Sequence, residues 1–147
     1  MYLSKRSNGV YYVWSTDELG HKRKVSTKQT LKSEALKFLQ DFKANEQEKK
    51  QRQQRLYLSQ FISDFRTHSK GTHAAKTTSA FAVALNQLLL VLGDVPLHKI
   101  GVREVENFLS VKKAEASQRT AQSYYSTLAS AFETAKRWNC ISVNPFR

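Results

Sequence analysis

The sequence is poor in the residues that cross-link or interrupt a fold. Its 147 residues include one cysteine, Cys140, two prolines and five glycines. A single cysteine excludes an internal disulfide and any zinc site built from several cysteines, which suits a reducing compartment. There is no long apolar span, and the start MYLSKRSNGV lacks the apolar core of a secretory signal. We therefore expect a cytoplasmic protein with no membrane partner.

Acidic side chains are also scarce. The chain has 24 Lys and Arg against 12 Asp and Glu, which gives a formal net charge of +12 and a pI near 10.0. A polyanion gains affinity from each cation that displaces one of its condensed counterions. Residues 1–55 hold thirteen basic and six acidic side chains, and residues 56–147 hold eleven and six. Because both halves are cationic, we expect one long nucleic acid to contact both.

The first 44 residues have the pattern of a small sheet followed by a helix. Three short runs, YLSKR, VYYVWST and HKRKVST, are rich in aromatic and β-branched residues and are separated by Ser7-Asn8-Gly9 and by residues 17–20. Asn-Gly favours a tight turn, so the runs predict a three-stranded antiparallel meander. The next segment, TLKSEALKFLQDF, changes to a helical period. Its apolar positions, which we expect to cover one face of the sheet, are Leu31, Ala35, Leu36, Leu39 and Phe42.

The other face of this sheet is the first candidate site. If Val13 and Val25 face the helix, strand alternation exposes a set of aromatic and basic residues on the opposite side. This set is Tyr12, Trp14, Lys22 and Lys24, beside Lys5 and Arg6 of the first strand. Aromatics among cations on a narrow sheet suit a DNA major groove. Two alternatives stay open: Tyr12 or Trp14 belongs to the core and the lysines only keep the sheet soluble, or a one-residue change of register inverts the faces.

A polar segment divides the chain. Residues 43–55, KANEQEKKQRQQR, contain no large apolar residue, so they either extend the preceding helix into solvent or form a tether. We therefore predict a first domain of residues 1–44, a linker or helix extension of residues 45–55, and a second domain of residues 56–147.

The second domain is predicted to be helical throughout. Four amphipathic stripes follow one another and imply a compact bundle. The stripes are Leu58, Phe61, Ile62 and Phe65; Phe81, Ala84, Leu85, Leu88, Leu89 and Leu92; Val102, Val105, Phe108 and Leu109; and Ala121, Tyr125, Leu128, Phe132 and Ala135. The expected fold class is thus α+β, with a three-stranded antiparallel sheet and one helix followed by a four-helix bundle.

Two consecutive segments resemble a known family. LHKIGVREVENFL followed by SQRTAQSYYSTLASAFETAKRWNCISVNPF resembles the SAM-like core-binding domain of phage integrases and other tyrosine recombinases. The strands and the TLKSEAL helix resemble the arm-type DNA-binding domain that many integrases carry in front of it. The two together cover nearly the whole chain in the family's order, which is more specific than either alone.

The resemblance implies a function and partners. The chain is expected to be the DNA-binding part of a site-specific recombinase that integrates or excises a mobile element. Its partner would be double-stranded DNA at arm and attachment sites, with assembly into a homo-oligomer on the DNA. The location would be the bacterial cytoplasm, in association with the nucleoid.

Further DNA contacts follow by position from the family. They lie at the starts of two helices, where free backbone N–H groups and the helix dipole favour phosphate, and at two lysines just before the last helix. These residues are Lys76, Thr77 and Thr78; Ser117, Gln118, Arg119, Thr120 and Gln122; and Lys112 and Lys113. The alternative is that Ser117 and Thr120 only cap the helix and the lysines are solvated.

No catalytic residue can be assigned. In tyrosine recombinases the segment after the Asn-Pro enters a catalytic domain with an arginine, a lysine, a His-x-x-Arg pair and the attacking tyrosine. None of the four histidines here has an arginine three positions later, and their spacing matches no common metal site. We therefore expect DNA binding without cleavage, and neither metal nor cofactor.

Two other functions compete with this one. The same modules could form a free-standing DNA-binding regulator or architectural protein without recombinase chemistry. A weaker alternative makes the helical half a protein-interaction module and RNA the partner of the sheet.

Overall fold

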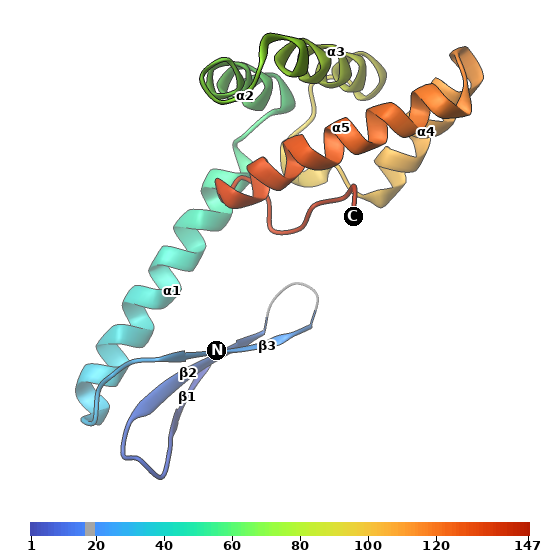
Figure 1. Cartoon of the computed structure of the whole chain (residues 1–147). Coiled ribbons are helices and arrows are strands. Elements are labelled where there is room, and N and C mark those ends of the chain that lie inside the picture. The colour runs from blue at the N-terminus through green and yellow to red at the C-terminus, as the bar shows by residue number, and fades with distance from the viewer. Residues whose placement is uncertain (17–19) are drawn as a thin grey trace. The chain divides into compact units, whose positions relative to one another are not determined.

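In the computed structural model, the described residues are 1–16 and 20–147, and they form two compact units, residues 1–49 and 50–147. Strands β1 (Tyr2–Lys5), β2 (Tyr11–Thr16) and β3 (Lys22–Ser26) precede helix α1 (Lys32–Gln54), which begins in the first unit and ends in the second (Figure 1). The division therefore falls inside α1, within the polar segment.

The sheet of the first unit is the antiparallel meander that the sequence predicts, with strand order β1-β2-β3. At the first turn Gly9 has a φ of +78°, and the side-chain oxygen of Asn8 accepts a hydrogen bond from the Val10 N–H at 3.2 Å. Gly9 thus supplies the positive φ of the turn, while Asn8 bonds to the backbone two residues on. The second turn was expected at residues 17–20, of which only Gly20, with φ +82°, lies within the described residues.

The register of the sheet decides which face is inward. Val13 is paired with Leu3 on one side and Val25 on the other, and it has no exposed surface. Trp14 is paired with Tyr2 and Lys24. Since alternate residues point to opposite faces, Val13 marks the inner face and Trp14 the outer one, as the sequence analysis assumed.

Helix α1 buries less of its apolar surface than expected. Ala35 is fully buried, but Leu31 is 59% exposed and Leu36 is 44% exposed. Leu31 precedes the helix, and Leu36 lies about 100° around the helix from Ala35, so neither can share its inward face. Phe38, which lies outside the predicted stripe, instead stacks on Phe42 with ring centroids 6.2 Å apart.

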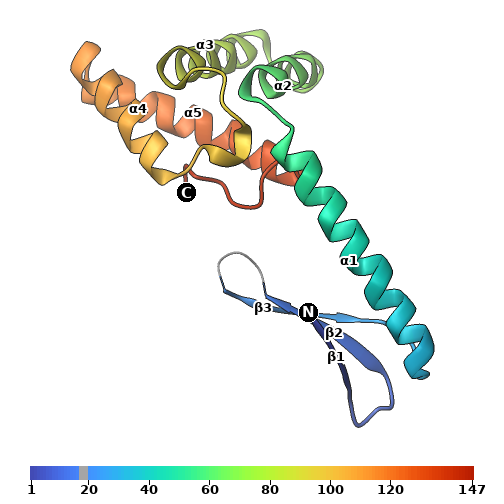
Figure 2. The ribbon, with the colours of Figure 1, turned by 180° about the vertical axis from the view of Figure 1, so that it is seen from behind.

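The second unit consists of α2 (Leu58–Thr72), α3 (Ala75–Leu92), α4 (Val102–Glu115) and α5 (Gln118–Arg137) (Figures 1 and 2). It also contains a short 3-10 helix, η1 (Leu97–Lys99), and the last turn of α1. The α+β class is confirmed: five α-helices follow the sheet, namely α1 and the four of this unit, and the predicted count of four was slightly off because it did not include η1.

The core of the second unit follows the predicted stripes closely. Helices α2 and α3, α3 and α5, α3 and α4, and α4 and α5 pack against each other. Phe61, Phe65, Phe108 and Phe132 are at most 1% exposed, and the rings of Phe61 and Phe132 lie 5.9 Å apart. The exception is Val102, which is 60% exposed because it is the first residue of α4 and lies outside the inward stripe that begins at Val105.

The turn after α3 supplies the cap that α2 lacks. Tyr57, at the start of α2, makes no side-chain capping bond. Instead Asp94 accepts hydrogen bonds from the Ser59 N–H at 2.9 Å and the Ser59 hydroxyl at 2.7 Å. A carboxylate at this end also suits the helix dipole. The loop between α3 and η1 is therefore held against the start of α2.

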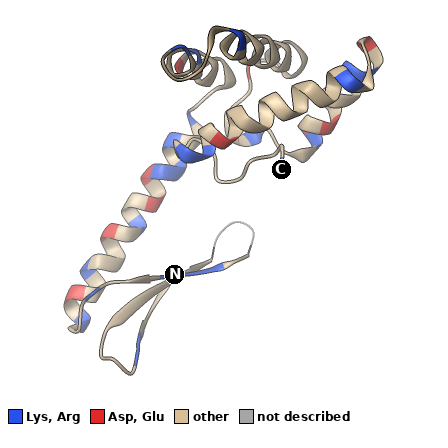
Figure 3. Ribbon diagram, in the orientation of Figure 1, with Lys and Arg blue, Asp and Glu red and all other residues tan. Residues whose placement is uncertain are grey.

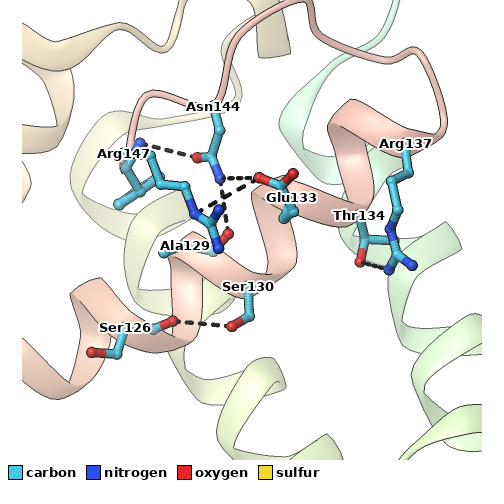
Figure 4. A network of polar contacts seen from close by, with 9 residues as sticks. Ser126, Ala129, Ser130, Glu133, Thr134, Arg137, Asn144 and Arg147 are labelled. Carbon is cyan, nitrogen blue, oxygen red and sulfur yellow. Dashed lines mark hydrogen bonds and ion pairs between the residues drawn. The ribbon is translucent and has the colours of Figure 1, made fainter.

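The chain after α5 folds back onto that helix. Phe146 is fully buried, with ring centroids 4.8 Å from Phe132 and 5.9 Å from Tyr125. Asn144, 3% exposed, donates to the Ala129 carbonyl at 3.0 Å and to Glu133 at 3.1 Å, and its oxygen accepts from the Phe146 N–H at 3.0 Å (Figure 4). The NPF sequence is therefore part of the core of the second unit.

No long apolar span was expected from the sequence, but helix α3 is long and apolar enough to cross a membrane, by length and composition alone. One such helix is weak evidence, because a core helix passes the same test. Phe81, Ala84, Leu85 and Leu88 of α3 are buried in the bundle, as expected of a core helix.

Candidate nucleic-acid interface

The outer face of the sheet carries a cluster of aromatic and basic side chains, which we call the sheet cluster: Tyr2, Arg6, Tyr12, Trp14 and Lys24. The Lys24 ammonium lies 5.1 Å from the ring centre of Tyr12 and 5.9 Å from that of Trp14. The Arg6 guanidinium lies 5.8 Å from the Tyr12 ring, and Tyr2 stacks on Trp14 at 6.4 Å. Lys22, paired with Thr16, lies on the same face by register. The exposed face thus combines flat rings with cations.

Lys5 is not on this face. It is paired with Tyr11, two residues before Val13, so its side chain belongs to the inner side of the sheet. Its ammonium lies 5.6 Å from the ring centre of Tyr11. The placement of Lys5 beside Tyr12 and Trp14 was therefore wrong, because β1 alternates in the same way as β2.

The Asn8 side chain and the positive charges of the sheet cluster affect the pKa of the Tyr12 hydroxyl. A hydrogen bond from the Asn8 side chain, at 3.4 Å, lowers the pKa of the Tyr12 hydroxyl. Burial opposes this effect, and a hydrogen bond with Ser26 and the positive charges of Lys24 and Arg6 lower the pKa further. A positive potential at the ring is what an approaching phosphate would also experience.

In the second unit, the start of α3 leaves two of its three candidate residues available. Lys76 and Thr77 are exposed, and α3 has neither a side-chain cap nor an acidic residue in its first turn. Thr78 is half-buried, and its hydroxyl donates to the Ser69 carbonyl at 3.2 Å. Thr78 therefore joins α3 to α2, and its hydroxyl is already engaged.

The start of α5 combines capping with exposed polar groups. The Ser117 hydroxyl accepts a hydrogen bond from the Thr120 N–H at 3.1 Å and lies 3.0 Å from the Thr120 hydroxyl. These two residues thus cap the helix, as the alternative interpretation held, whereas Arg119 and Gln122 are exposed. The two interpretations are compatible, because Ser117 is itself exposed.

A groove of about 440 Å³ lies beside the start of α5. It is lined by Leu109, Ser110, Lys113, Gln118, Ala121, Gln122 and Tyr125. Of the candidate residues, the fold thus brings Lys113, Gln118 and Gln122 together where α4 meets α5. Ser110, which no sequence signal singled out, joins them because it lies one turn before Lys113 on α4.

Lys112 is not available for DNA. It is 7% exposed, and its ammonium donates to Gln87 and to Glu115, both at 2.7 Å. A buried ammonium needs such partners, and phosphate could reach it only if they were lost. The sequence could not distinguish Lys112 from Lys113, because one of the partners, Gln87, lies 25 residues earlier on α3.

Among the described residues, no group of three or more His, Cys, Asp or Glu side chains could hold a metal ion. His68 stacks edge-on against Trp138 at 5.1 Å, and His73 lies near Phe81 at 5.3 Å. These histidines therefore belong to an aromatic contact between helix ends.

No protein-family model and no curated protein matches the chain. Solved structures do match it: the chain has the fold of part of a phage integrase. One match is lambda integrase as a tetramer bound to a Holliday junction, with 18% identity, a TM-score of 0.59 and coverage of 98% of this chain and 45% of that one. Another is a lambda integrase dimer bound to a COC′ core site, with 18% identity, a TM-score of 0.60 and coverage of 98% and 43%. The chain therefore spans less than half the length of the integrases it matches.

Proposed function

We propose that the chain is the DNA-binding part of a site-specific tyrosine recombinase that integrates or excises a mobile element. The observation that carries this proposal is the shared fold, over 98% of the chain, with integrases solved on DNA. A formal charge of +12 is consistent with it, since it provides many phosphate-binding cations.

The two units are proposed to hold different DNA segments. The sheet cluster of the first unit would contact accessory, arm-type sites, because its rings and cations form one exposed face. The second unit would contact the core site through Lys76 and Thr77 on α3, and through Lys113, Arg119 and Gln122 around the groove. On DNA the chain would assemble with further copies, as the matched integrases do.

The chain is proposed to bind DNA without cleaving it. Phosphoryl transfer by a tyrosine requires cations placed to stabilise the charge that develops on the phosphate. The tyrosines of this chain lie in β1 and β2 (Tyr2, Tyr11, Tyr12), at the start of α2 (Tyr57) and in α5 (Tyr124, Tyr125), and the sequence contains no His-x-x-Arg pair that would supply such cations. Nicking of supercoiled DNA by the purified chain would contradict this part of the proposal.

A competition experiment tests the choice of polyanion. The labelled chain is bound to a duplex taken from the DNA flanking its own gene, and unlabelled duplex of the same sequence, single-stranded RNA or heparin is added at equal concentration of negative charge. The proposal expects the duplex to compete best. Equal competition by all three would show that the chain binds polyanions without preference for duplex DNA. Stronger competition by RNA would favour the RNA-binding alternative.

The alternative of a free-standing DNA-binding regulator uses the same surfaces. The mass of the protein expressed from its native gene separates the two: a product of about twice this length supports the recombinase, and one of 147 residues supports the regulator.

A further inference from the structure

A second basic surface lies at the far end of α5, outside all the candidate residues discussed above. It consists of Arg52 in the last turn of α1, Arg55 just beyond it, and Lys136 and Arg137 in the last turn of α5. We call these four residues the helix-end cluster. All four are exposed. Figure 3 shows Lys and Arg on both of these adjoining helix ends.

Hydrogen bonds hold the two helix ends together. The Gln53 side-chain amide donates to the Asn139 carbonyl at 3.0 Å, and its oxygen accepts from the Ser142 hydroxyl at 3.5 Å. Gln53 lies between Arg52 and Arg55, and Asn139 lies two residues after Arg137. The contact therefore brings cations that are about 85 residues apart in sequence into one surface of the second unit.

Three acids lie near the cluster without pairing with Arg52, Arg55 or Lys136: Glu48 one turn before Arg52 on α1, Glu133 one turn before Lys136 on α5, and Asp64, whose charge raises the pKa of Cys140. Residues 50–55 and 134–147 contain no Asp or Glu. Within the described part of the chain, no carboxylate lies within ion-pair distance of Arg52, Arg55 or Lys136. Glu133 is the nearest acid on α5, and it is engaged by Asn144 at 3.1 Å and by Arg147 at 3.9 Å. The Arg137 guanidinium donates to the Thr134 hydroxyl at 2.9 Å, which leaves its other N–H groups available.

Helix stability explains only part of this arrangement. A cation in the last turn of a helix interacts favourably with the helix dipole, which accounts for Arg52, Lys136 and Arg137 one helix at a time. The helix dipole does not account for Arg55, which lies beyond the end of α1. It also does not explain why two cationic helix ends lie against each other, since like charges repel. A surface that gathers unpaired cations in this way is suited to a polyanion.

We propose that the helix-end cluster binds the phosphodiester backbone of duplex DNA as a second contact region of the second unit. The inference rests on the proposed function and extends it to residues that neither the sequence nor the integrase resemblance assigned. Arginine is suited to the role because its planar fork binds two phosphate oxygens at once.

The length of α5 sets the distance between this contact and the contacts at the start of the helix. Helix α5 has 20 residues, so its two ends lie about 30 Å apart at 1.5 Å per residue. That length corresponds to about nine base pairs of duplex. Contacts at the start of α5 and at the helix-end cluster would therefore protect phosphates separated by nearly one turn of DNA.

The test compares two triple variants of the 147-residue chain that lose the same charge. One is Arg52→Gln, Arg55→Gln and Lys136→Gln; the matched control is Arg66→Gln, Lys99→Gln and Arg103→Gln, which are exposed cations on α2, η1 and α4. Affinity for a duplex from the flanking DNA is measured as a function of salt, with circular dichroism to verify folding.

The inference expects the cluster variant to bind at least about tenfold more weakly than the control near 0.1 M salt. Its salt slope should be reduced by about 0.9 for each lost phosphate contact, close to 3 in total. A cluster variant that matches the control in both affinity and slope would overturn the inference while leaving the proposed function standing. Failure of the unsubstituted chain to prefer duplex would instead overturn the proposed function.

Discussion

At the residue scale, partners far away in sequence decide what each charged side chain can do. Lys112 and Lys113 are adjacent and chemically identical, yet one is buried against Gln87 and Glu115 and the other lines the groove beside α5. Lys24 lies over two aromatic rings on the outer face of the sheet, while Arg23, its neighbour, lies on the inner side by register. The first distinction requires the tertiary fold, but the second follows from strand alternation alone.

Lys24 and Arg23 give a matched pair for testing the sheet cluster. Lys24→Gln should weaken binding to an arm-type duplex and reduce the salt slope by about 0.9, because one phosphate contact is lost. Arg23→Gln removes the same charge from the other face and should change binding much less. Fluorescence anisotropy over a salt series measures both. Equal losses in the two variants would show that only net charge matters at this sheet.

Glu133 predicts a dependence of stability on pH. The hydrogen bond from Asn144, with the charges of Arg147, Lys136 and Arg137, lowers the pKa of Glu133 below its ordinary value of 4.5. A carboxyl whose pKa is lowered by folding stabilises the fold above its unfolded pKa, and this stabilisation is lost as the pH falls through the folded pKa.

Thermal unfolding from pH 6 down to pH 3 checks this prediction. Glu133→Gln should show a smaller decrease in Tm over this range than the unsubstituted chain. The control is Glu106→Gln, an exposed substitution on α4. If Glu133→Gln and Glu106→Gln gave the same pH dependence as the unsubstituted chain, the contacts of Glu133 would contribute nothing to stability.

At the element scale, periodic segments were predictable and irregular ones were not. The stripes of α2, α3 and α5 match the buried residues because an apolar face repeats every three to four residues. Leu36 was predicted to lie on the buried face of α1, but it is 44% exposed because it lies about 100° around the helix from Ala35. The segment after α5 has no periodicity, so the burial of Asn144 and Phe146 could not be foreseen from their types.

Substitutions at Ser117 separate its two candidate roles in α5. Ser117→Ala should lower the free energy of unfolding by about 1 kcal/mol, because the Thr120 N–H loses its acceptor. Ser117→Asn and Ser117→Asp should both retain the cap, but only Asp places a negative charge where phosphate is expected.

Urea unfolding and DNA binding are measured together on these variants. We expect near-normal stability for Asn and Asp, with DNA affinity maintained by Asn and reduced by Asp. Undiminished affinity in the Asp variant would remove the start of α5 from the interface and leave Ser117 as a cap alone.

At the scale of the whole molecule, the architecture could be predicted from the composition and from the order of the segments. The sequence predicts that both halves are cationic, that a polar segment divides them, and that a meander is followed by a helix and a helical bundle. The helix-end cluster was not, because the Gln53 to Asn139 contact that assembles it joins positions 86 residues apart. Surfaces made of two distant segments are visible only after the chain has folded.

Hydroxyl-radical footprinting of the chain on the DNA flanking its own gene tests most directly whether each unit binds duplex DNA. We expect two separate protected regions, one of which is lost on Lys24→Gln while the other is kept. A single protected region that weakens as a whole with this substitution, or uniform protection without preferred sites, would contradict this expectation.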